Sequence, residues 1–219
     1  MEFHIRKQRL IVLLLTIVLV LVAFPYVQGN LFADVLLNAL QATIVISCIA
    51  VVSTDRKHFV FALALGILSL LSGWIPRSQE SLHLFAIGSI GSIAFYAFAI
   101  VMIVGYVLQD GDVTLNMLAG ALCSYMLIGF LWAEVYDLLE YLHPYSFLAV
   151  QDQHNRQEWS DLLYFSFTTL TGAGYGDITP ATAQTRSAAL LESVTGVFYI
   201  AVMVARLVGL HISGRSRES

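Results

Sequence analysis

A run rich in glycine between two apolar segments, Gly172-Ala173-Gly174-Tyr175-Gly176, could present backbone carbonyls to a cation. A dehydrated cation needs several oxygen ligands at close range, and backbone carbonyls supply them without a charged side chain. Glycine at alternate positions lets a strand turn successive carbonyls the same way, because glycine tolerates positive φ without steric cost. We therefore expect the ion sites to lie in this strand, with Thr171 at its start and Asp177 just beyond its end.

The segment before this strand, from Trp159 to Thr171, is apolar, aromatic and about 13 residues long. A helix of that length is too short to cross about 30 Å of hydrocarbon, so we expect it to enter the membrane and stop halfway. The strand then returns to the side of entry, and Pro180 marks the turn before the last apolar segment. Non-helical backbone at membrane depth is tolerated where it lines a water-filled cavity, and a pore supplies one.

Composition and segment lengths predict an all-α membrane protein. Of the 219 residues, 58% are hydrophobic and 12% charged, against roughly 25% charged in soluble domains. The net charge of −4 predicts no nucleic-acid partner, whereas the apolar segments imply contact with membrane lipid. Six of them approach or exceed the roughly 20 residues of a transmembrane helix. Their approximate ranges are Leu10–Val27, Leu31–Val52, Phe59–Ile75, Leu84–Leu108, Leu115–Tyr141 and Thr185–Ile212.

The basic residues predict the orientation of these helices. With six crossings, most Lys and Arg residues share one side of the membrane, and the positive-inside rule puts that side in the cytoplasm. Both termini are then cytoplasmic, and we expect a multi-pass protein of the cell inner (plasma) membrane. The cytoplasmic set is Arg6, Lys7, Arg9, Arg56, Lys57, Arg206, Arg215 and Arg217, and the opposite set is Arg77, Arg156 and Arg186.

From about Leu115 to Ile212, the chain resembles the pore domain of the potassium channel superfamily. That family places an outer helix, a pore helix, a selectivity filter and an inner helix in this order, and its filter usually reads T-x-x-T-V-G-Y-G-D. Pro180 matches the family's proline after the filter, and Arg186 matches an arginine at the outer end of the inner helix. Gly196 matches the inner-helix glycine that serves as a gating hinge.

The resemblance implies a potassium-conducting channel that acts by passive transport and is not an enzyme. Potassium would bind at the carbonyls of Gly172, Ala173, Gly174 and Tyr175, as a permeant ligand, and no cofactor is expected. One chain offers one re-entrant loop, so three identical subunits would complete a homotetramer around a four-fold axis. The chain would divide into a four-span N-terminal membrane domain, 1–110, and a pore domain, 111–219.

One departure from the family pattern affects the inner end of the filter. Gly172 stands where the family has a threonine, whose hydroxyl and carbonyl form the innermost ion site, and Ala173 replaces the usual valine. The carbonyls remain, but the innermost site loses its hydroxyl ligands. We therefore expect an inner site that binds weakly and selectivity over sodium that is reduced, while Tyr175 between two glycines favours potassium over a non-selective pore.

Four residues are expected to support the filter. In the family, an aromatic donor at the position of Tyr164 bonds the aspartate after the filter, here Asp177, although both Tyr164 and Phe165 also suit a membrane interface. Phe165 is expected to pack on the Tyr175 ring. The other two supporting residues are Thr168 and Glu192.

Glu192 lies within an apolar helix, where an ionisable side chain is costly and indicates a function. We expect it to accept hydrogen bonds from Thr168 or Thr171, or to be protonated by burial. A plainer interpretation is an interhelical contact to Ser124 or Tyr125 of the fifth segment.

The remaining charges suggest little about function. Three acidic residues near the outer end of the fifth segment could concentrate cations near the mouth of a pore, but we expect them to be solvated: Glu134, Asp137 and Glu140. The fourth segment, Leu84–Leu108, has no Lys or Arg, so it cannot act as a voltage sensor, which needs regularly spaced arginines. Its small residues instead predict close helix packing: Gly88, Ser89, Gly91, Ser92 and Gly105.

Other classes of protein remain as alternatives. A weakly selective or non-selective monovalent cation channel, and a non-conducting regulatory subunit with a pore fold, both fit the sequence. The run Gly88-Ser89-Ile90-Gly91-Ser92 is similar to the serine motif of rhomboid proteases, but no histidine lies mid-span to serve as a base. Cys48 and Cys123 lie within apolar segments and are expected to be buried thiols rather than a disulfide.

Overall fold

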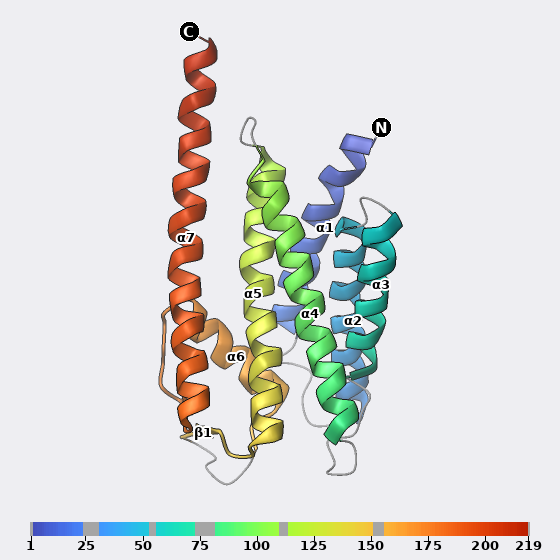
Figure 1. Ribbon diagram of the computed structural model, residues 1–219, viewed down its shortest axis with the longest axis vertical. Coiled ribbons are helices and arrows are strands. Elements are labelled where there is room, and N and C mark those ends of the chain that lie inside the picture. The colour runs from blue at the N-terminus through green and yellow to red at the C-terminus, as the bar shows by residue number, and fades with distance from the viewer. Residues whose placement is uncertain are drawn as a thin grey trace. The chain divides into compact units, whose positions relative to one another are not determined.

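The computed structural model describes residues 2–23, 31–52, 56–72, 82–109, 114–150 and 156–218. These residues form helices with a pair of short strands (Figure 1). The chain divides into two compact units, Met1–Met126 and Leu127–Ser219, and the boundary falls inside helix α5. The predicted domain boundary near residue 110 stays a prediction.

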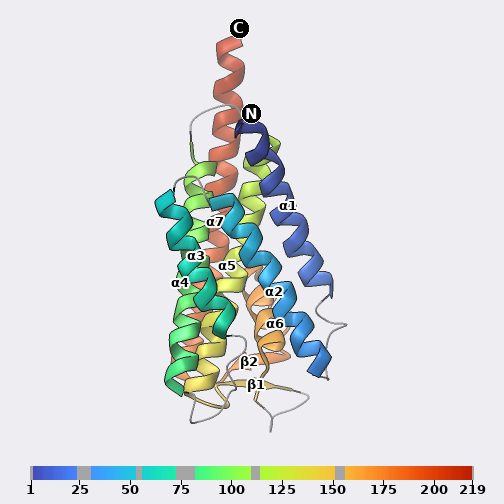
Figure 2. The same cartoon turned by 90° about the vertical axis from the view of Figure 1, so that its right-hand side faces the viewer.

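The N-terminal unit is a helical bundle, seen most clearly in Figure 2. Long apolar stretches without proline favour these helices, because lipid leaves no partner for an unpaired backbone group. Along the bundle, α1 packs on α2, and α3 packs on both α2 and α4. The helices are α1 (Glu2–Ala23), α2 (Leu31–Val52), α3 (Arg56–Ser72) and α4 (Leu82–Val107), followed by the first part of α5 (Leu115–Leu142).

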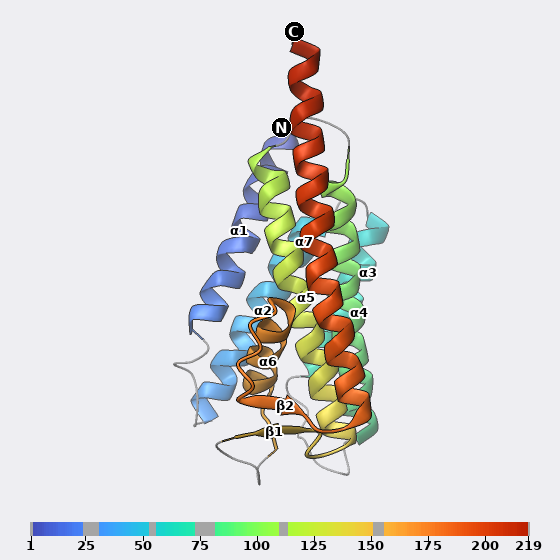
Figure 3. The same cartoon turned by 90° about the vertical axis from the view of Figure 1, so that its left-hand side faces the viewer.

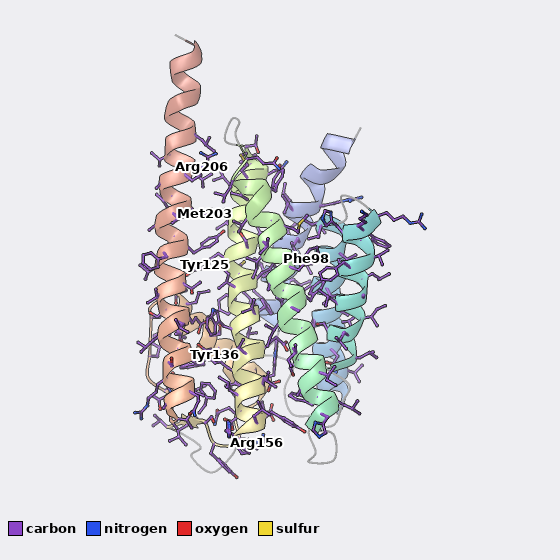
Figure 4. All side chains as sticks on the ribbon, in the orientation of Figure 1. Phe98, Tyr125, Tyr136, Arg156, Met203 and Arg206 are labelled. Carbon is purple, nitrogen blue, oxygen red and sulfur yellow. The ribbon has the colours of Figure 1, made fainter. Side chains whose placement is uncertain are left out.

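Small residues set the contact between α3 and α4. A Cβ added to Gly91 would lie 2.4 Å from the Leu68 side chain, and the buried Ser92 hydroxyl donates to Ser69 Oγ at 3.0 Å. The close packing predicted for Gly91 and Ser92 is confirmed. Phe98 adds an edge-to-face contact with Phe61, at a ring separation of 5.0 Å, and Figure 4 labels it on α4.

The cysteines of this unit are buried and free, as predicted. The Cys123 thiol of α5 donates to the carbonyl of Leu10 at 3.5 Å. Gly120, one turn earlier, lies against Val107, since a Cβ there would approach its side chain to 2.8 Å. The first part of α5 therefore belongs to the core of the N-terminal unit.

The C-terminal unit contains the rest of α5, helix α6 (Trp159–Leu170) and helix α7 (Ala183–Glu218). Figure 3 shows that α6 is much shorter than its neighbours. The strands β1 (Phe147–Ala149) and β2 (Ile178–Pro180) pair antiparallel, with Leu148 opposite Thr179. This pair is the departure from the predicted all-α architecture.

Three helices are long and apolar enough to cross a membrane among the residues described, over His83–Val107, Leu115–Leu142 and Ala183–Leu210. Shorter apolar helices cover Arg9–Ala23 and Asn38–Val52, and α3 has 17 residues. The structure thus supports a largely helical, multi-pass membrane protein, and six crossings stay a prediction. Three predicted features lie outside the described residues: the first segment's end at Val27, the third's end at Ile75, and Arg77.

Candidate pore site

Helix α6 is a half-length helix with a defined start. The Asp161 side chain accepts a hydrogen bond from the Glu158 backbone N–H at 3.1 Å, which satisfies a donor at the helix N-terminus. Its 12 residues extend about 18 Å, well short of the hydrocarbon thickness. After α6 the chain returns to the level of the strands (Figure 3), which is the path predicted for a re-entrant segment.

The strand after α6 alternates between two backbone conformations. Gly172, Gly174 and Gly176 have φ of +74°, +51° and +78°, a region that other residues rarely adopt. Ala173 and Tyr175 between them are not at positive φ. When residues alternate between right- and left-handed conformations, successive N–H groups point to the same side of the chain.

Hydrogen bonds show which side the N–H groups take. The Gly172 N–H donates to the Thr169 carbonyl, and the Gly174 N–H donates to the Thr168 carbonyl, each at 3.1 Å. The strand is therefore held from behind by the last carbonyls of α6. The N–H groups of Gly172 and Gly174 therefore point toward α6.

The whole strand is exposed on a single chain. Every residue from 171 to 177 is exposed, and the Tyr175 side chain is 74% exposed. A Cβ added to any of the strand glycines would meet no atom within 4 Å. Among the residues that the structure describes, none covers the glycine positions at which the predicted ion sites lie.

Tyr164 and Asp177 form the predicted hydrogen bond. The Tyr164 hydroxyl donates to Asp177 Oδ2 at 2.8 Å. The Tyr164 ring also stacks on Tyr175, with centroids 6.4 Å apart and planes within 5°. The prediction that Phe165 packs on Tyr175 was wrong, because the helical turn places Tyr164 on that face.

Phe165 instead points into a buried aromatic cluster. Its ring contacts Tyr136 of α5 and Phe147 of β1 at centroid separations of 5.1 and 5.2 Å, and those two rings are 5.2 Å apart. All three contacts are edge-to-face, an arrangement that stabilises aromatic pairs beyond the area they bury. The cluster joins α5, α6 and the strand pair, and Figure 4 labels Tyr136 at its centre.

Glu192 is fully buried beside this cluster. The Tyr136 hydroxyl donates to Glu192 Oε2, and Ser166 Oγ lies 2.5 Å from Glu192 Oε1. The predicted partners differ: Thr168 and Thr171 donate to carbonyls of α6 itself. Glu192 thus contacts α6 through Ser166, two residues before Thr168, and contacts α5 through Tyr136.

The number of hydrogens available at Ser166 bears on the protonation state of Glu192. Ser166 Oγ also lies 2.8 Å from the Gly129 carbonyl, and a hydroxyl has a single hydrogen to donate. If that hydrogen is given to Gly129, the short contact to Glu192 needs a proton on the carboxyl group. A neutral Glu192 therefore satisfies every group in the set, whereas a carboxylate leaves Ser166 one hydrogen short.

Gly196 touches the end of α6. A Cβ at this position would lie 2.1 Å from the Leu170 carbonyl oxygen and 3.0 Å from its carbon. These are backbone atoms and cannot move aside cheaply, so a glycine is needed for α7 to approach the base of the strand. The gating-hinge role of Gly196 stays a prediction, but its contact role is independent of it.

The segment beyond the strand is fixed to the turn after α5. The Val150 N–H donates to the Asp177 carbonyl and the Ala181 N–H to the Ser146 carbonyl, both at 2.8 Å. Arg186 Nε donates to the Pro180 carbonyl at 3.2 Å. The outer end of the strand is thereby attached to both neighbouring helices.

The acidic residues of α5 were wrongly predicted to be solvated. Glu134, Asp137 and Glu140 are 4%, 6% and 2% exposed. The Glu140 carboxylate accepts the N–H groups of Tyr145 and Phe147 at 2.9 and 3.1 Å. It thus holds the turn into β1, where Tyr145 has a φ of +67°.

Two further side chains tie the loop before α6 to α5. Trp159 Nε1 donates to Glu134 Oε1 at 3.0 Å, and Arg156 Nη2 donates to the Glu140 carbonyl at 2.9 Å. Figure 4 labels Arg156 near the end of α5. Together with Tyr136 and Ser166, these residues form a supporting shell that the sequence did not reveal, since none of them lies in a recognisable motif.

Comparison with known proteins agrees with this geometry. Residues 130–211 match a protein family described as "Ion channel". The match begins in α5 and includes α6, the strand and most of α7. No curated protein and no solved structure gave a significant match. The family match supports an ion channel over the C-terminal unit and does not specify the ion.

Proposed function

We propose that four copies of this chain form a potassium-conducting channel, with residues 171–176 as its selectivity filter. The observation that supports this most directly is the alternation of positive φ at Gly172, Gly174 and Gly176, in a strand held from behind by α6 and exposed on its other side. Four such strands around an axis would surround a narrow path with carbonyl oxygens. Each chain would contribute the carbonyls of Gly172, Ala173, Gly174 and Tyr175.

The orientation of α6 favours a cation on this path. The C-terminal end of a helix carries about half a negative charge, and α6 ends at Leu170, directly before the strand. In a site shielded from bulk water, that field offsets part of the cost of removing an ion's hydration shell. Transport is passive, because the site needs only oxygens in fixed positions and no covalent step.

Four residues behind the strand would keep those carbonyl oxygens in fixed positions. Tyr164 and Asp177 brace the outer end of the strand, Thr168 holds its middle through the Gly174 N–H, and Glu192 joins α6 to α5 and α7. A filter selects by the number and placement of its oxygens, so these residues would act on selectivity without touching the ion.

A weakly selective cation channel is the second candidate, and Gly172 favours it. The side chain that would add four hydroxyl ligands at the inner end is missing. The φ of +74° at this residue also means that the backbone differs from one that a threonine readily adopts. The inner site is therefore the place where sodium would compete best.

Vesicle flux separates the candidates. Purified protein in liposomes loaded with potassium should release potassium when a protonophore balances the charge, and a Gly174→Ala variant, strained at φ +51°, should be silent. Under bi-ionic potassium and sodium, a reversal potential far from zero indicates potassium selectivity and one near zero indicates the weakly selective channel. Absence of flux from a folded wild-type tetramer would leave the non-conducting subunit.

A further inference from the structure

The N-terminal unit contains a pocket that the pore does not use. Its volume is about 350 Å³, within the range of about 300–1,000 Å³ typical of ligand sites. Its lining residues come from α1, α2 and the end of α4. The residues that define its chemistry are Arg9, Val52, Val101, Gly105, Tyr106 and Gln109.

Gly105 makes the pocket possible. It was predicted to permit close helix packing, like Gly91 on the same helix, but no atom lies within 4 Å of a Cβ built at Gly105. At Gly91 the same Cβ would meet Leu68 at 2.4 Å. The prediction for Gly105 was wrong, and the glycine leaves an open space where Gly91 leaves none.

Both aliphatic and polar side chains line the pocket. Val52 and Val101 are among its aliphatic lining residues, whereas Arg9, Tyr106 and Gln109 supply its polar groups. Arg9 Nη1 donates to the Ala50 carbonyl at 2.7 Å, which fixes the guanidinium at the pocket. A guanidinium has five N–H groups, so this bond leaves others to bind an anion.

The pocket lies where a membrane interface is expected. Arg9 precedes the apolar part of α1, Val52 ends α2, and Gln109 follows the end of α4, so the pocket sits at one end of these helices. Arg56 and Lys57 begin α3 at the end of the unit where α2 stops. Tyrosine and arginine at such a level are typical of the zone of lipid headgroups.

We propose that this pocket binds an anionic phospholipid, with an acyl chain against the aliphatic walls and the phosphate on Arg9. Basic pockets between transmembrane helices on the cytoplasmic side bind anionic headgroups, and the apolar volume excludes a purely polar anion as the preferred ligand. The proposal needs only that the protein is embedded in a membrane. It does not depend on ion conduction, so it stands or falls separately from the proposed channel.

The test measures lipid binding by the full-length protein in detergent, using native mass spectrometry. Dioleoyl-phosphatidylglycerol should bind about fivefold more tightly than dioleoyl-phosphatidylcholine, as one basic contact provides. Arg9→Gln should abolish this preference, whereas Arg56→Gln, which removes an exposed charge outside the pocket, should retain it. Gly105→Phe fills the space and should weaken binding of both lipids, and Gly209→Phe, equally open but on α7, should not.

Helix content measured by circular dichroism shows whether Gly105→Phe folds, and Gly105→Leu takes its place if it does not. Equal affinity of the wild type for the two lipids would overturn the proposal. Unchanged binding by every folded Gly105 variant would do so as well. Glycerol phosphate that binds as tightly as the phospholipid would show that the acyl chain has no part in the site.

Discussion

In the proposed filter, backbone conformation restricts the residue type at each position as much as side-chain chemistry does. Gly172 lacks the hydroxyl of the threonine that the family has at this position. Its φ of +74° shows that it also provides a conformation, since it begins the alternation that Gly174 and Gly176 continue. Replacing it therefore changes both the ligands and the geometry of the inner site.

We expect Gly172→Thr to lower stability despite matching the family pattern. A left-handed conformation costs a residue with a Cβ roughly 1–2 kcal/mol, so the thermal unfolding midpoint of the tetramer should fall. Ala173→Val is the control, because Ala173 is not at positive φ and should accept the usual valine. A Gly172→Thr protein as stable as the wild type, with higher potassium selectivity, would show that only the hydroxyl matters.

Substitutions at Glu192 test whether its carboxyl group is neutral. A glutamine can accept from Tyr136 and donate to Ser166, which then donates to Gly129, so Glu192→Gln should unfold at nearly the wild-type temperature. Glu192→Leu removes the acceptor of the buried Tyr136 hydroxyl, and such a loss costs about 1–3 kcal/mol. A glutamine variant as unstable as the leucine variant would mean that the group works as a carboxylate.

At the scale of elements, α6 is held at its start, middle and end by contacts with neighbouring elements. Its start is fixed through Trp159 and Glu134, its middle through the aromatic cluster, and its end through the Gly196 contact. The strand it carries has few bonds of its own, so its geometry follows the position of the helix. Movement of α7 would reach the strand through Leu170.

Gly196→Ala should separate α7 from α6. The added methyl group would lie 2.1 Å from the Leu170 carbonyl oxygen, so we expect loss of potassium flux together with a lower unfolding midpoint. Gly209→Ala is the matched control on the same helix, where a Cβ meets nothing within 4 Å and helix propensity favours alanine. If Gly196 is only a hinge, Gly196→Ala would alter channel opening and leave stability unchanged.

The sequence predicted the elements better than their contacts. The half-length helix, the returning strand and the Tyr164–Asp177 bond follow from segment lengths and one motif. The partners of Glu192 could not be predicted in this way. Tyr136 and Ser166 are 56 and 26 residues away in the sequence, and packing sets the rotation of each helix about its axis. Three-residue strands are too short to show alternation, so β1 and β2 were missed. Glu140 was judged solvated because its partners are backbone N–H groups.

For the whole molecule, assembly is the property on which the proposed function rests. The strand from residue 171 to 177 is exposed on one chain, and α7 has large exposed apolar residues, among them Leu190, Val197 and Phe198. Copies packed around an axis would cover both. The N-terminal unit has its own buried core and its own pocket.

The protein in a mild detergent should have four times the mass of one chain. Native mass spectrometry measures this mass directly. The Arg9→Gln variant should have the same mass ratio, because Arg9 belongs to the N-terminal unit. Potassium should raise the unfolding temperature of the tetramer more than sodium does, because a ligand stabilises the state that binds it. A stable monomer that nonetheless conducts would contradict a filter shared among four chains.

The uncovered strand also bears on how the protein is made. A newly inserted chain that meets no others would present a row of bare peptide groups to hydrocarbon, which cannot solvate them. Such orphan chains should be short-lived and accessible to membrane proteases, so that abundance in the cell depends steeply on the rate of synthesis. Coexpression of a defective copy would then have a dominant-negative effect, because mixed complexes that contain it would be inactive.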